Sequence, residues 1–418
     1  MFLLLLILII KLLIINSLRI KYGFKSLPVI ILCLFFIYSQ CFFLDYLLFG
    51  VEAINYGRMS KMTIYSLNYR KIVLLYLLFF IGYFTILYFS KFEKPKYKAL
   101  HYYQNNKGYN ILLFFICFIS ILYIVLNIYG LSRYEKINFL AGETLIVTFL
   151  SMSFFGVIIL FVKNKMSHKR DRLFLSLAPL ILVYGLVEGG REVFLYLALV
   201  YIFCTDKKNL TITQVLFTLI VFVMIVLWKV ISIYVFEVND ISLMINYLSN
   251  DFRFSITNLD PLGSLLMLNE YLNDPSFFNE FKLSYLTNTI NHFLRAINMI
   301  DYESIAETTS NYYIPTSAKL GGGLAFCGIL ESILNFGFLG PLILGIILGL
   351  ISIRIMSLEF HSEFLYSVFS IFFVIICLKL VRTELAVVLK IYLMPMIVSY
   401  FLFYRATYSK KNIININV

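Results

Sequence analysis

Long runs of apolar residues recur from one end of this chain to the other, and they constrain its fold more than any other feature. A membrane-spanning helix needs about 20 consecutive, mostly apolar residues. Of the 418 residues, 61% are hydrophobic and only 14% are charged, whereas a soluble domain carries roughly 25% charged residues. This composition excludes a cytosolic enzyme and a nucleic-acid-binding module, so we expect an integral membrane protein.

The apolar runs predict an all-α fold, a polytopic membrane bundle of about eleven transmembrane helices. The first run could be read as a cleaved leader, but Lys11 inside it and the lack of a basic start favour a retained helix. No second, polar domain remains, so residues 1–418 are expected to form a single integral membrane domain. The expected spans are residues 2–18, 27–44, 72–90, 111–130, 144–162, 173–187, 193–204, 215–235, 342–353, 364–378 and 385–404.

The basic residues predict the direction in which the chain crosses the membrane. Lys and Arg gather in alternate loops, for example at 91–107 and 163–172, and short cytoplasmic loops are enriched in them. We therefore expect the N-terminus outside and the C-terminus in the cytoplasm. The net charge of +12 then reflects topology and attraction to anionic lipid, and no nucleic acid is expected as a partner.

One long segment, residues 238–325, lies between the eighth and ninth expected spans and should face outward as a large external loop. Apolar residues recur in it at helical spacing, first from Ile241 to Leu248 and again from Leu283 to Ile297. We expect amphipathic helices that lie on the bundle, with turns at 273–276 and 314–316. A function on the outer side of the membrane would reside here.

Two apolar stretches are too long for one crossing. Residues 173–204 would form a helix about 48 Å long and residues 324–353 one about 45 Å long, against a hydrocarbon core of roughly 30 Å. We expect a turn at Gly189 and Gly190, below the outer surface, which is tolerated only beside a water-filled cavity. A break at 337–341 would leave a re-entrant or surface helix that holds Glu331 near the outer interface.

Three arginines are candidates for binding an anionic group. Arg191 lies between two apolar half-helices, where a cation is unfavourable unless it faces water or an anion. A salt bridge with Glu188 or Glu192 is the alternative. Arg253 and Arg295 are the arginines of the long segment, and a guanidinium group binds phosphate bidentately. For these two, a solvated surface charge is the alternative.

Four further residues are candidates for the chemistry. His292 stands three residues before Arg295, on the same helical face, and could act as a general base or be a hydrogen-bonded bystander. Glu331, inside an apolar helix, is either a functional carboxylate or the partner of an arginine. Arg382 and Glu384 occupy a tight outer turn and could line the same cavity or form an ordinary ion pair.

Several signatures of other chemistries are missing from the sequence. It contains no GxxxxGK[ST], no HExxH, no Cys/His cluster and no GxSxG. The six cysteines lie inside or at the edge of apolar runs, which argues against a disulfide framework. No metal and no cofactor is therefore expected, and the chemistry would depend on arginines and one carboxylate or imidazole.

The stretch 321–341 reads GGGLAFCGILESILNFGFLGP. Its glycine-rich turn, the helix with Glu331, Asn335 and the Gly-x-x-Gly that begins at Gly337 resemble the end of the large periplasmic loop in bacterial O-antigen polymerases of the Wzy type. The Gly-Gly-Arg turn between two spans and the long outward segment with isolated arginines also resemble that family.

The resemblance implies a metal-independent glycosyltransferase on the outer side of the bacterial cytoplasmic membrane. It would move a growing O-antigen or capsule-like glycan from undecaprenyl pyrophosphate onto the next lipid-linked repeat unit. The arginines would bind the pyrophosphate, and a base, Glu331 or His292, would take the proton of the acceptor hydroxyl. The implied partners are the lipid-linked oligosaccharides and the bilayer, with a chain-length regulator and a flippase. The site residues that match these roles are Arg191, Arg253 and Arg295 for pyrophosphate and Glu331 and His292 for catalysis. Gly189, Gly190, Arg382 and Glu384 are expected along the cavity from their positions in the sequence.

Two alternative functions stay open. A flippase or transporter for lipid-linked oligosaccharide would be expected to distribute polar residues along the full membrane depth, whereas this chain concentrates them outside. An O-antigen ligase resembles the polymerase so closely in layout that composition does not separate the two.

Overall fold

The structure, a computed structural model, describes most of both ends of the chain and parts of its middle. Nearly all residues in these parts lie in helices, as expected. The strands among them are β1 (Ala53–Ile54) and β2 (Met62–Thr63), a short antiparallel pair. The described residues are 1–54, 59–90, 107–131, 135–136, 139, 152, 154–160, 162, 198–199, 202–203, 212, 216, 220, 227, 240–251, 256–259, 262–296, 299–300, 303–319, 325–360 and 362–407.

Six of the described helices are long and apolar enough to cross a membrane, and each falls on an expected span. The apolar helix α4 (Lys107–Ile128) falls on the expected span at 111–130. The four expected spans between residues 144 and 235 lie largely outside the described residues. The six candidate spans are α1 (Phe2–Tyr22), α2 (Leu27–Phe49), α3 (Leu67–Phe89), Gly328–Ser357, α19 (Glu363–Leu380) and Leu385–Leu402.

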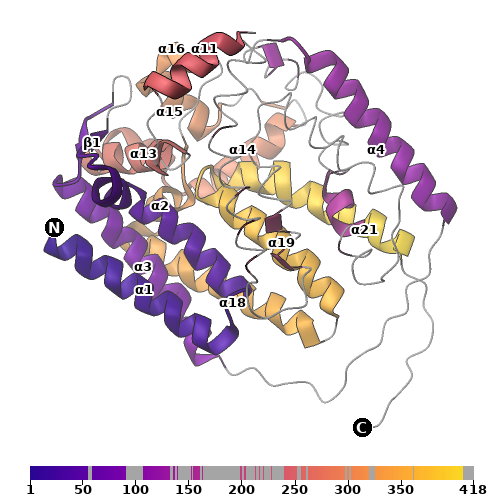
Figure 1. Cartoon of the computed structure of the whole chain (residues 1–418), viewed down its shortest axis with the longest axis horizontal. Coiled ribbons are helices and arrows are strands. Elements are labelled where there is room, and N and C mark those ends of the chain that lie inside the picture. Colours follow the sequence, from indigo (N-terminus) through magenta and orange to yellow (C-terminus); the bar gives the residue numbers. More distant parts are fainter. Residues whose placement is uncertain are drawn as a thin grey trace. The chain divides into compact units, whose positions relative to one another are not determined.

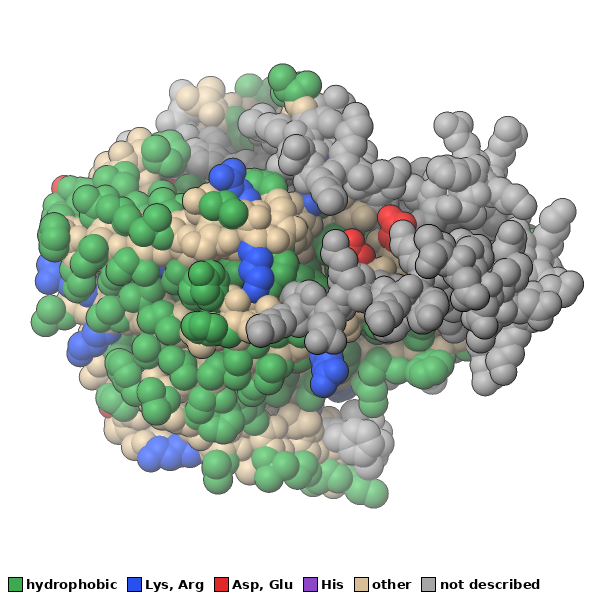
Figure 2. All heavy atoms as spheres, turned by 90° about the horizontal axis from the view of Figure 1, so that it is seen from below, with side chains coloured by type: hydrophobic (Ala, Val, Ile, Leu, Met, Phe, Trp, Pro, Cys, Tyr) green, Lys and Arg blue, Asp and Glu red, His purple; other side chains and the backbone are tan. Residues whose placement is uncertain are grey.

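These helices carry apolar side chains on their outer surface. In α1, Phe2 is 81% and Leu13 is 59% exposed. On the face that Figure 2 shows, hydrophobic side chains cover much of the described surface, and Lys and Arg side chains lie singly among them. Soluble monomers rarely expose contiguous apolar surface of this kind, which agrees with helices that face lipid.

The described residues belong to two compact units. In the second, which contains α4 and α21 (Met394–Thr407), the Ser399 hydroxyl donates to the Met152 carbonyl at 2.7 Å, and Phe155 packs edge to face on Phe372. The first unit comprises Met1–Lys91, Arg253–Arg354 and Val374–Lys390, and the second comprises Phe92–Phe252, Ile355–Phe373 and Ile391–Val418.

The core of the first unit is formed by α1, α2 and α3, which pack against one another (Figure 1). Between α2 and α3, the ring of Phe35 stacks on that of Phe79 with centroids 4.0 Å apart. Lys11 of α1 is fully buried here; its Nζ donates to Ser39 Oγ at 2.9 Å and lies 5.3 Å from the ring centroid of Phe80. The lysine therefore finds a hydroxyl acceptor and an aromatic face inside the bundle.

The helix α18 (Gly340–Ser357) approaches α3 at backbone distance because both helices carry glycine at the contact. A Cβ atom at Gly82 would overlap the Leu342 carbonyl, and one at Gly345 would overlap the Phe79 carbonyl. Small residues allow such close packing of membrane spans. Inside a bilayer the hydrophobic effect does not drive helices together, so their association depends on close van der Waals contacts.

The apolar stretch Gly328–Ser357 is interrupted, as the sequence predicts. The helix α17 (Gly328–Phe336) ends at Gly337, whose φ of +63° is readily adopted only by glycine. A short 3-10 turn, η4 (Gly337–Leu339), leads into α18. A Cβ atom at Gly340 would overlap the Ser332 carbonyl, so the chain folds back here. At nine residues, α17 is only about 14 Å long, too short to cross a membrane.

The long segment between the spans is helical, and the predicted turns at 273–276 and 314–316 separate its helices. The described elements are α11 (Ile241–Asn246), a π-helical turn (Tyr247–Asp251), α12 (Ile256–Leu259), α13 (Leu262–Asn273), the 3-10 helix η3 (Phe277–Phe281), α14 (Ser284–Ala296), α15 (Ile305–Tyr313) and α16 (Pro315–Lys319).

Two carboxylates tie this segment to the N-terminal part of the first unit, one at α2 and one at the loop between β1 and β2. Asp45, near the end of α2, accepts hydrogen bonds from the backbone N–H groups of Ile256 at 2.7 Å and Thr257 at 2.8 Å. Glu270 of α13 accepts from the backbone N–H and the hydroxyl of Ser60, both at 3.1 Å. These bonds fix the start of α12 and the middle of α13 on the bundle.

Candidate functional site

The helix α14 turns its polar face inward. Ser284, Asn288 and His292 follow one another at four-residue spacing and therefore share one side of the helix. All three are buried, whereas Leu286 and Ile290, on another side, are 66% and 49% exposed. In a soluble protein the apolar side would be the buried one, so the polar side chains of α14 must have partners inside the first unit.

The partner of Ser284 is on α17. The side-chain amide of Asn335 donates to Ser284 Oγ at 2.9 Å and to the carbonyl of Glu331 at 2.7 Å, and its oxygen accepts from the Tyr285 N–H at 3.1 Å. One asparagine thus closes the last turn of α17 and binds the first turn of α14. Burial, followed by the charge of Glu331, raises the pKa of the Tyr285 hydroxyl, which therefore stays protonated.

The turn after α19 supplies the second carboxylate. The backbone N–H groups of Arg382 and Thr383 donate to the Lys379 carbonyl at 2.9 and 2.8 Å, and Glu384 follows as the residue before the short helix α20 (Leu385–Val387). Gly328 lets α17 approach this turn, because a Cβ there would lie 2.9 Å from the Leu380 carbonyl oxygen.

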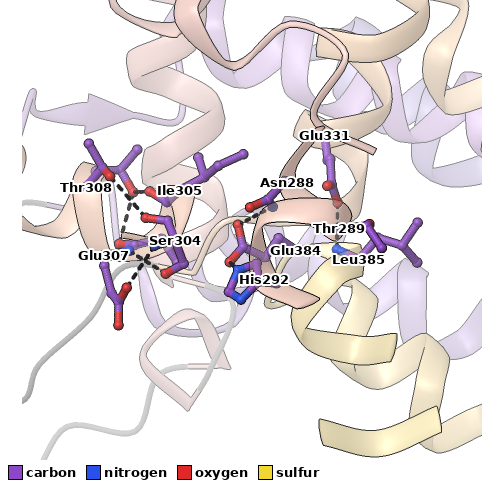
Figure 3. A network of polar contacts seen from close by, with 12 residues as sticks. Asn288, Thr289, His292, Ser304, Ile305, Glu307, Thr308, Glu331, Glu384 and Leu385 are labelled. Carbon is purple, nitrogen blue, oxygen red and sulfur yellow. Dashed lines mark hydrogen bonds and ion pairs between the residues drawn. The ribbon is translucent and has the colours of Figure 1, made fainter. Parts of the chain in front are cut away.

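Glu384 is fully buried and uses both carboxylate oxygens. Its Oε1 lies 3.0 Å from His292 Nε2, and its Oε2 accepts from Asn288 Nδ2 at 2.9 Å (Figure 3). Two hydrogen bonds from neighbouring turns of α14 hold one carboxylate, so the position of the imidazole is set by Glu384.

Glu331 lies next to this arrangement and is also fully buried. Its Oε2 accepts from the backbone N–H of Leu385, the residue after Glu384, at 2.7 Å (Figure 3). Its Oε1 has no hydrogen-bond partner among the residues that the structure describes. Buried polar atoms are normally paired, and the other hydrogen-bonding group that acts on this carboxyl is the Ser284 side chain. We call Glu331, Glu384, His292, Asn288 and Asn335 the Glu331–Glu384 network.

Three of the residues singled out from the sequence therefore meet in one place: Glu331, His292 and Glu384. Arg382 is half-buried in the turn that leads to Glu384. Arg295 lies on α14 three residues after His292, but its side chain is outside the described part of the chain. The remaining candidates, Gly189, Gly190, Arg191 and Arg253, lie outside the described residues.

Asn288 was missed by sequence reasoning, and Asn335 was noted only as part of the family motif. The signal for Asn288 was present: Ser284, Asn288 and His292 form a polar stripe opposite the apolar positions of the same helix. Such a stripe is ambiguous by itself, because it is usually the solvated face of a helix.

The chemistry available here is that of two carboxyl groups and an imidazole. A carboxylate with one unused oxygen can accept a proton from a hydroxyl group, and an imidazole held by a carboxylate can donate or accept one. Within the described residues, no group of three or more His, Cys, Asp or Glu side chains is arranged to hold a metal ion.

Comparison with known proteins agrees with this architecture. The family model described as O-antigen polysaccharide polymerase Wzy matches residues 1–412, nearly the whole chain. No curated protein and no solved structure matches the chain. The family match and the apolar spans together give a multi-pass protein of the bacterial inner membrane with lipid-linked oligosaccharide substrates. The chain therefore belongs to the O-antigen polysaccharide polymerase Wzy family and is a membrane glycosyltransferase that polymerises lipid-linked repeat units.

Proposed function

We propose that the protein uses undecaprenyl-pyrophosphate-linked glycan as donor and carries out the transfer without a metal ion. An acceptor hydroxyl on the incoming repeat unit attacks the anomeric carbon of the growing chain. The bond from that carbon to the pyrophosphate oxygen breaks, the pyrophosphate leaves with the electron pair, and the hydroxyl proton passes to a base. The observation that carries this proposal is the buried Glu331 carboxyl group with its unpartnered Oε1.

Glu331 is the proposed base. Its Oε2 is occupied by the Leu385 N–H at 2.7 Å, so Oε1 is the atom that would receive the proton. His292 is the second proposed catalytic group, beside the reacting hydroxyl or the leaving group. Glu384 is a positioning residue, because it acts through His292 and Asn288.

The proposed pyrophosphate site consists of Arg191, Arg253 and Arg295. Preorganised guanidinium groups stabilise the charge that develops on a leaving diphosphate, which is the reason no metal ion is required. Arg295 follows His292 by one turn of α14, and this supports a diphosphate near the Glu331–Glu384 network. Gly189, Gly190 and Arg382 are proposed to line the same cavity.

The proposed topology has about eleven spans, with the N-terminus outside and the C-terminus in the cytoplasm. Residues 1–418 form one integral membrane domain, and residues 238–325 form its large external loop. The basic loops support this orientation. The lipid tails of both substrates enter laterally between spans, and a flippase and a chain-length regulator are the proposed protein partners.

The test is the substitution Glu331→Gln, read as the length of the surface glycan. Glutamine keeps the size of the side chain and an oxygen for the Leu385 N–H, but it does not take up a proton. We expect glycan one repeat unit long, as in a strain that lacks the protein, because a general base contributes roughly 10²–10⁴-fold to the rate.

The matched control is Glu363→Gln, which changes an exposed carboxylate at the start of α19 and should leave long chains. Long glycan from Glu331→Gln would exclude Glu331 as the base. In the deletion strain, intact long chains left on their lipid carrier would instead indicate a ligase, and single units retained on the cytoplasmic side would indicate a flippase.

A further inference from the structure

A cluster of aromatic side chains lies on the long segment, apart from the Glu331–Glu384 network. Phe278 is fully buried at its base and contacts Tyr271 and Tyr313, with ring centroids 5.6 and 6.5 Å away. Phe277 and Tyr312 stack on each other with centroids 4.4 Å apart and planes 22° apart. The cluster joins α13, η3 and α15, so its outer rings rest on a rigid base.

Tyr312 presents an aromatic face to the surroundings. Its residue is 62% exposed although one face of the ring is covered by Phe277. Tyr313 stands edge to face against it at 4.9 Å. Phe277 and Tyr313 hold the Tyr312 ring on two sides, and the opposite face is left for a ligand.

The turn between Tyr271 and Phe277, two rings of this cluster, carries exposed hydrogen-bonding groups. Asn273 and Asp274, both exposed, lie at the turn just before η3. Asn68 Nδ2 donates to Asn273 Oδ1, and Asn273 Nδ2 donates to Ser60 Oγ at 3.3 Å. These bonds hold the Asn273 amide in one orientation at the surface.

Two carboxylates lie on the same segment as these rings, Glu270 in α13 and Asp274 in the turn that follows it. Burial, followed by interactions with Glu270, Tyr312 and Asp274, raises the pKa of Tyr313 to about 12, so this phenol remains a hydrogen-bond donor. Glu270 in turn accepts from the Ser60 N–H and hydroxyl. The exposed ring of Tyr312 thus belongs to a cluster that also contains the Tyr313 phenol and adjoins the turn with the exposed Asn273 amide and Asp274 carboxylate.

This combination matches a sugar ring. A pyranose has an apolar face of C–H groups that packs on an aromatic ring, and hydroxyl groups around its edge that bond to carboxylate and amide groups. An aromatic residue supplies this contact at a low entropic cost because it has few rotatable bonds. A purely lipid-facing aromatic surface would not carry the exposed Asp274 carboxylate in the adjoining turn, because burying charge in lipid is unfavourable.

We propose that Tyr312, with Tyr313, Asn273 and Asp274, forms a binding subsite for a sugar residue of the lipid-linked glycan. We call it the Tyr312 subsite. It extends the proposed function, on which it rests for the identity of the ligand. Because η3 packs against α17, the subsite and Glu331 are connected through that short helix. The subsite holds a sugar remote from the reacting bond, and binding there positions the chain for transfer.

The test measures binding of the repeat-unit oligosaccharide released by mild acid from the lipid-linked pool of a polymerase-deletion strain. The full-length protein is used in detergent, and Kd is determined by calorimetry. We expect Tyr312→Ala to raise Kd about tenfold, the range of a lost aromatic contact. Tyr312→Phe keeps the ring and should stay within about twofold of the unchanged protein.

The matched control is Tyr65→Ala, which removes another half-exposed tyrosine that packs on Tyr46. Unchanged Kd in Tyr312→Ala would overturn the proposal, and so would an equal loss in Tyr65→Ala or a loss in Tyr312→Phe. Quenching of a fluorophore at position 312 by brominated lipid, together with unchanged Kd, would assign the ring to the membrane instead.

The Glu331→Gln variant separates this inference from the proposed function. We expect it to form no polymer, and Tyr312→Ala introduced into this variant should still raise Kd about tenfold. If Glu331→Gln still polymerises, the catalytic assignment fails but a tenfold loss in Tyr312→Ala still supports the subsite. If Glu331→Gln is inactive and Tyr312→Ala binds normally, only the subsite fails.

Discussion

Removing the Glu384 carboxylate tests whether the network is held together in the way that its hydrogen bonds indicate. Glu384→Ala deletes the acceptor of both His292 Nε2 and Asn288 Nδ2, at 3.0 and 2.9 Å. All three side chains are at least nine-tenths buried, so water cannot readily replace the lost oxygens. An unsatisfied buried polar group costs about 1–3 kcal/mol, which gives about 2–6 kcal/mol for the two.

A milder substitution at the same position is Glu384→Gln, which should lose only one of the two hydrogen bonds. Its amide oxygen can still accept from one of the two donors, whereas its NH₂ group cannot accept from the other. The expected loss is therefore about half, roughly 1–3 kcal/mol. The free energy of unfolding is measured by titration with sodium dodecyl sulfate in mixed micelles, with Glu363→Ala as the exposed control, which should stay within about 0.5 kcal/mol.

A double-mutant cycle isolates the contact between Glu384 and Asn288. Asn288→Ala should destabilise the unchanged protein more than it destabilises Glu384→Ala, with a coupling energy of about 0.5–3 kcal/mol. Zero coupling, or a loss in Glu384→Ala no greater than in Glu363→Ala, would refute the reasoning, because two buried donors would then have lost their acceptor at no cost.

Two further predictions concern the anion site and the packing of the spans. Arg191→Ala should abolish chain growth and Arg191→Lys should retain little, because lysine cannot bind a diphosphate bidentately; long glycan from the alanine variant would remove Arg191 from the site. Gly345→Ala places a methyl group on the Phe79 carbonyl and should lower the free energy of unfolding by about 1–3 kcal/mol. Gly349→Ala, whose methyl would lie 3.3 Å from both the Ile86 side chain and the Tyr83 carbonyl oxygen, against an overlap with the Phe79 carbonyl oxygen for Gly345, should cost less. Equal losses would argue against the closer backbone contact at Gly345.

The spans and breaks were predictable because they depend on local composition. The apolar runs predict α1, α2, α3 and α19 within a few residues, and the glycines at 337 and 340 predict the end of α17. These features follow from the hydropathy of each segment and the conformational range of glycine.

The partners within the site were not predictable in the same way. Glu331 and His292 stand out as ionisable groups in unusual surroundings, but their link through Glu384 depends on a turn 92 residues beyond His292. The inward direction of the polar face of α14 was equally unpredictable from the sequence, because a polar stripe such as Ser284, Asn288 and His292 normally faces water. Its direction is decided by the tertiary contacts with Asn335 and Glu384.

The order of these segments along the chain has a consequence for biosynthesis. Proteins are made from the N-terminus, and segments begin to fold as they emerge. Asn288 and His292 leave the ribosome well before Glu384, the acceptor that orients them, and Glu384 comes into place only once α19 has been inserted. The newly made protein therefore has its reacting groups held in position only near the end of translation, when the bundle that must hold its lipid-linked substrates is almost fully assembled.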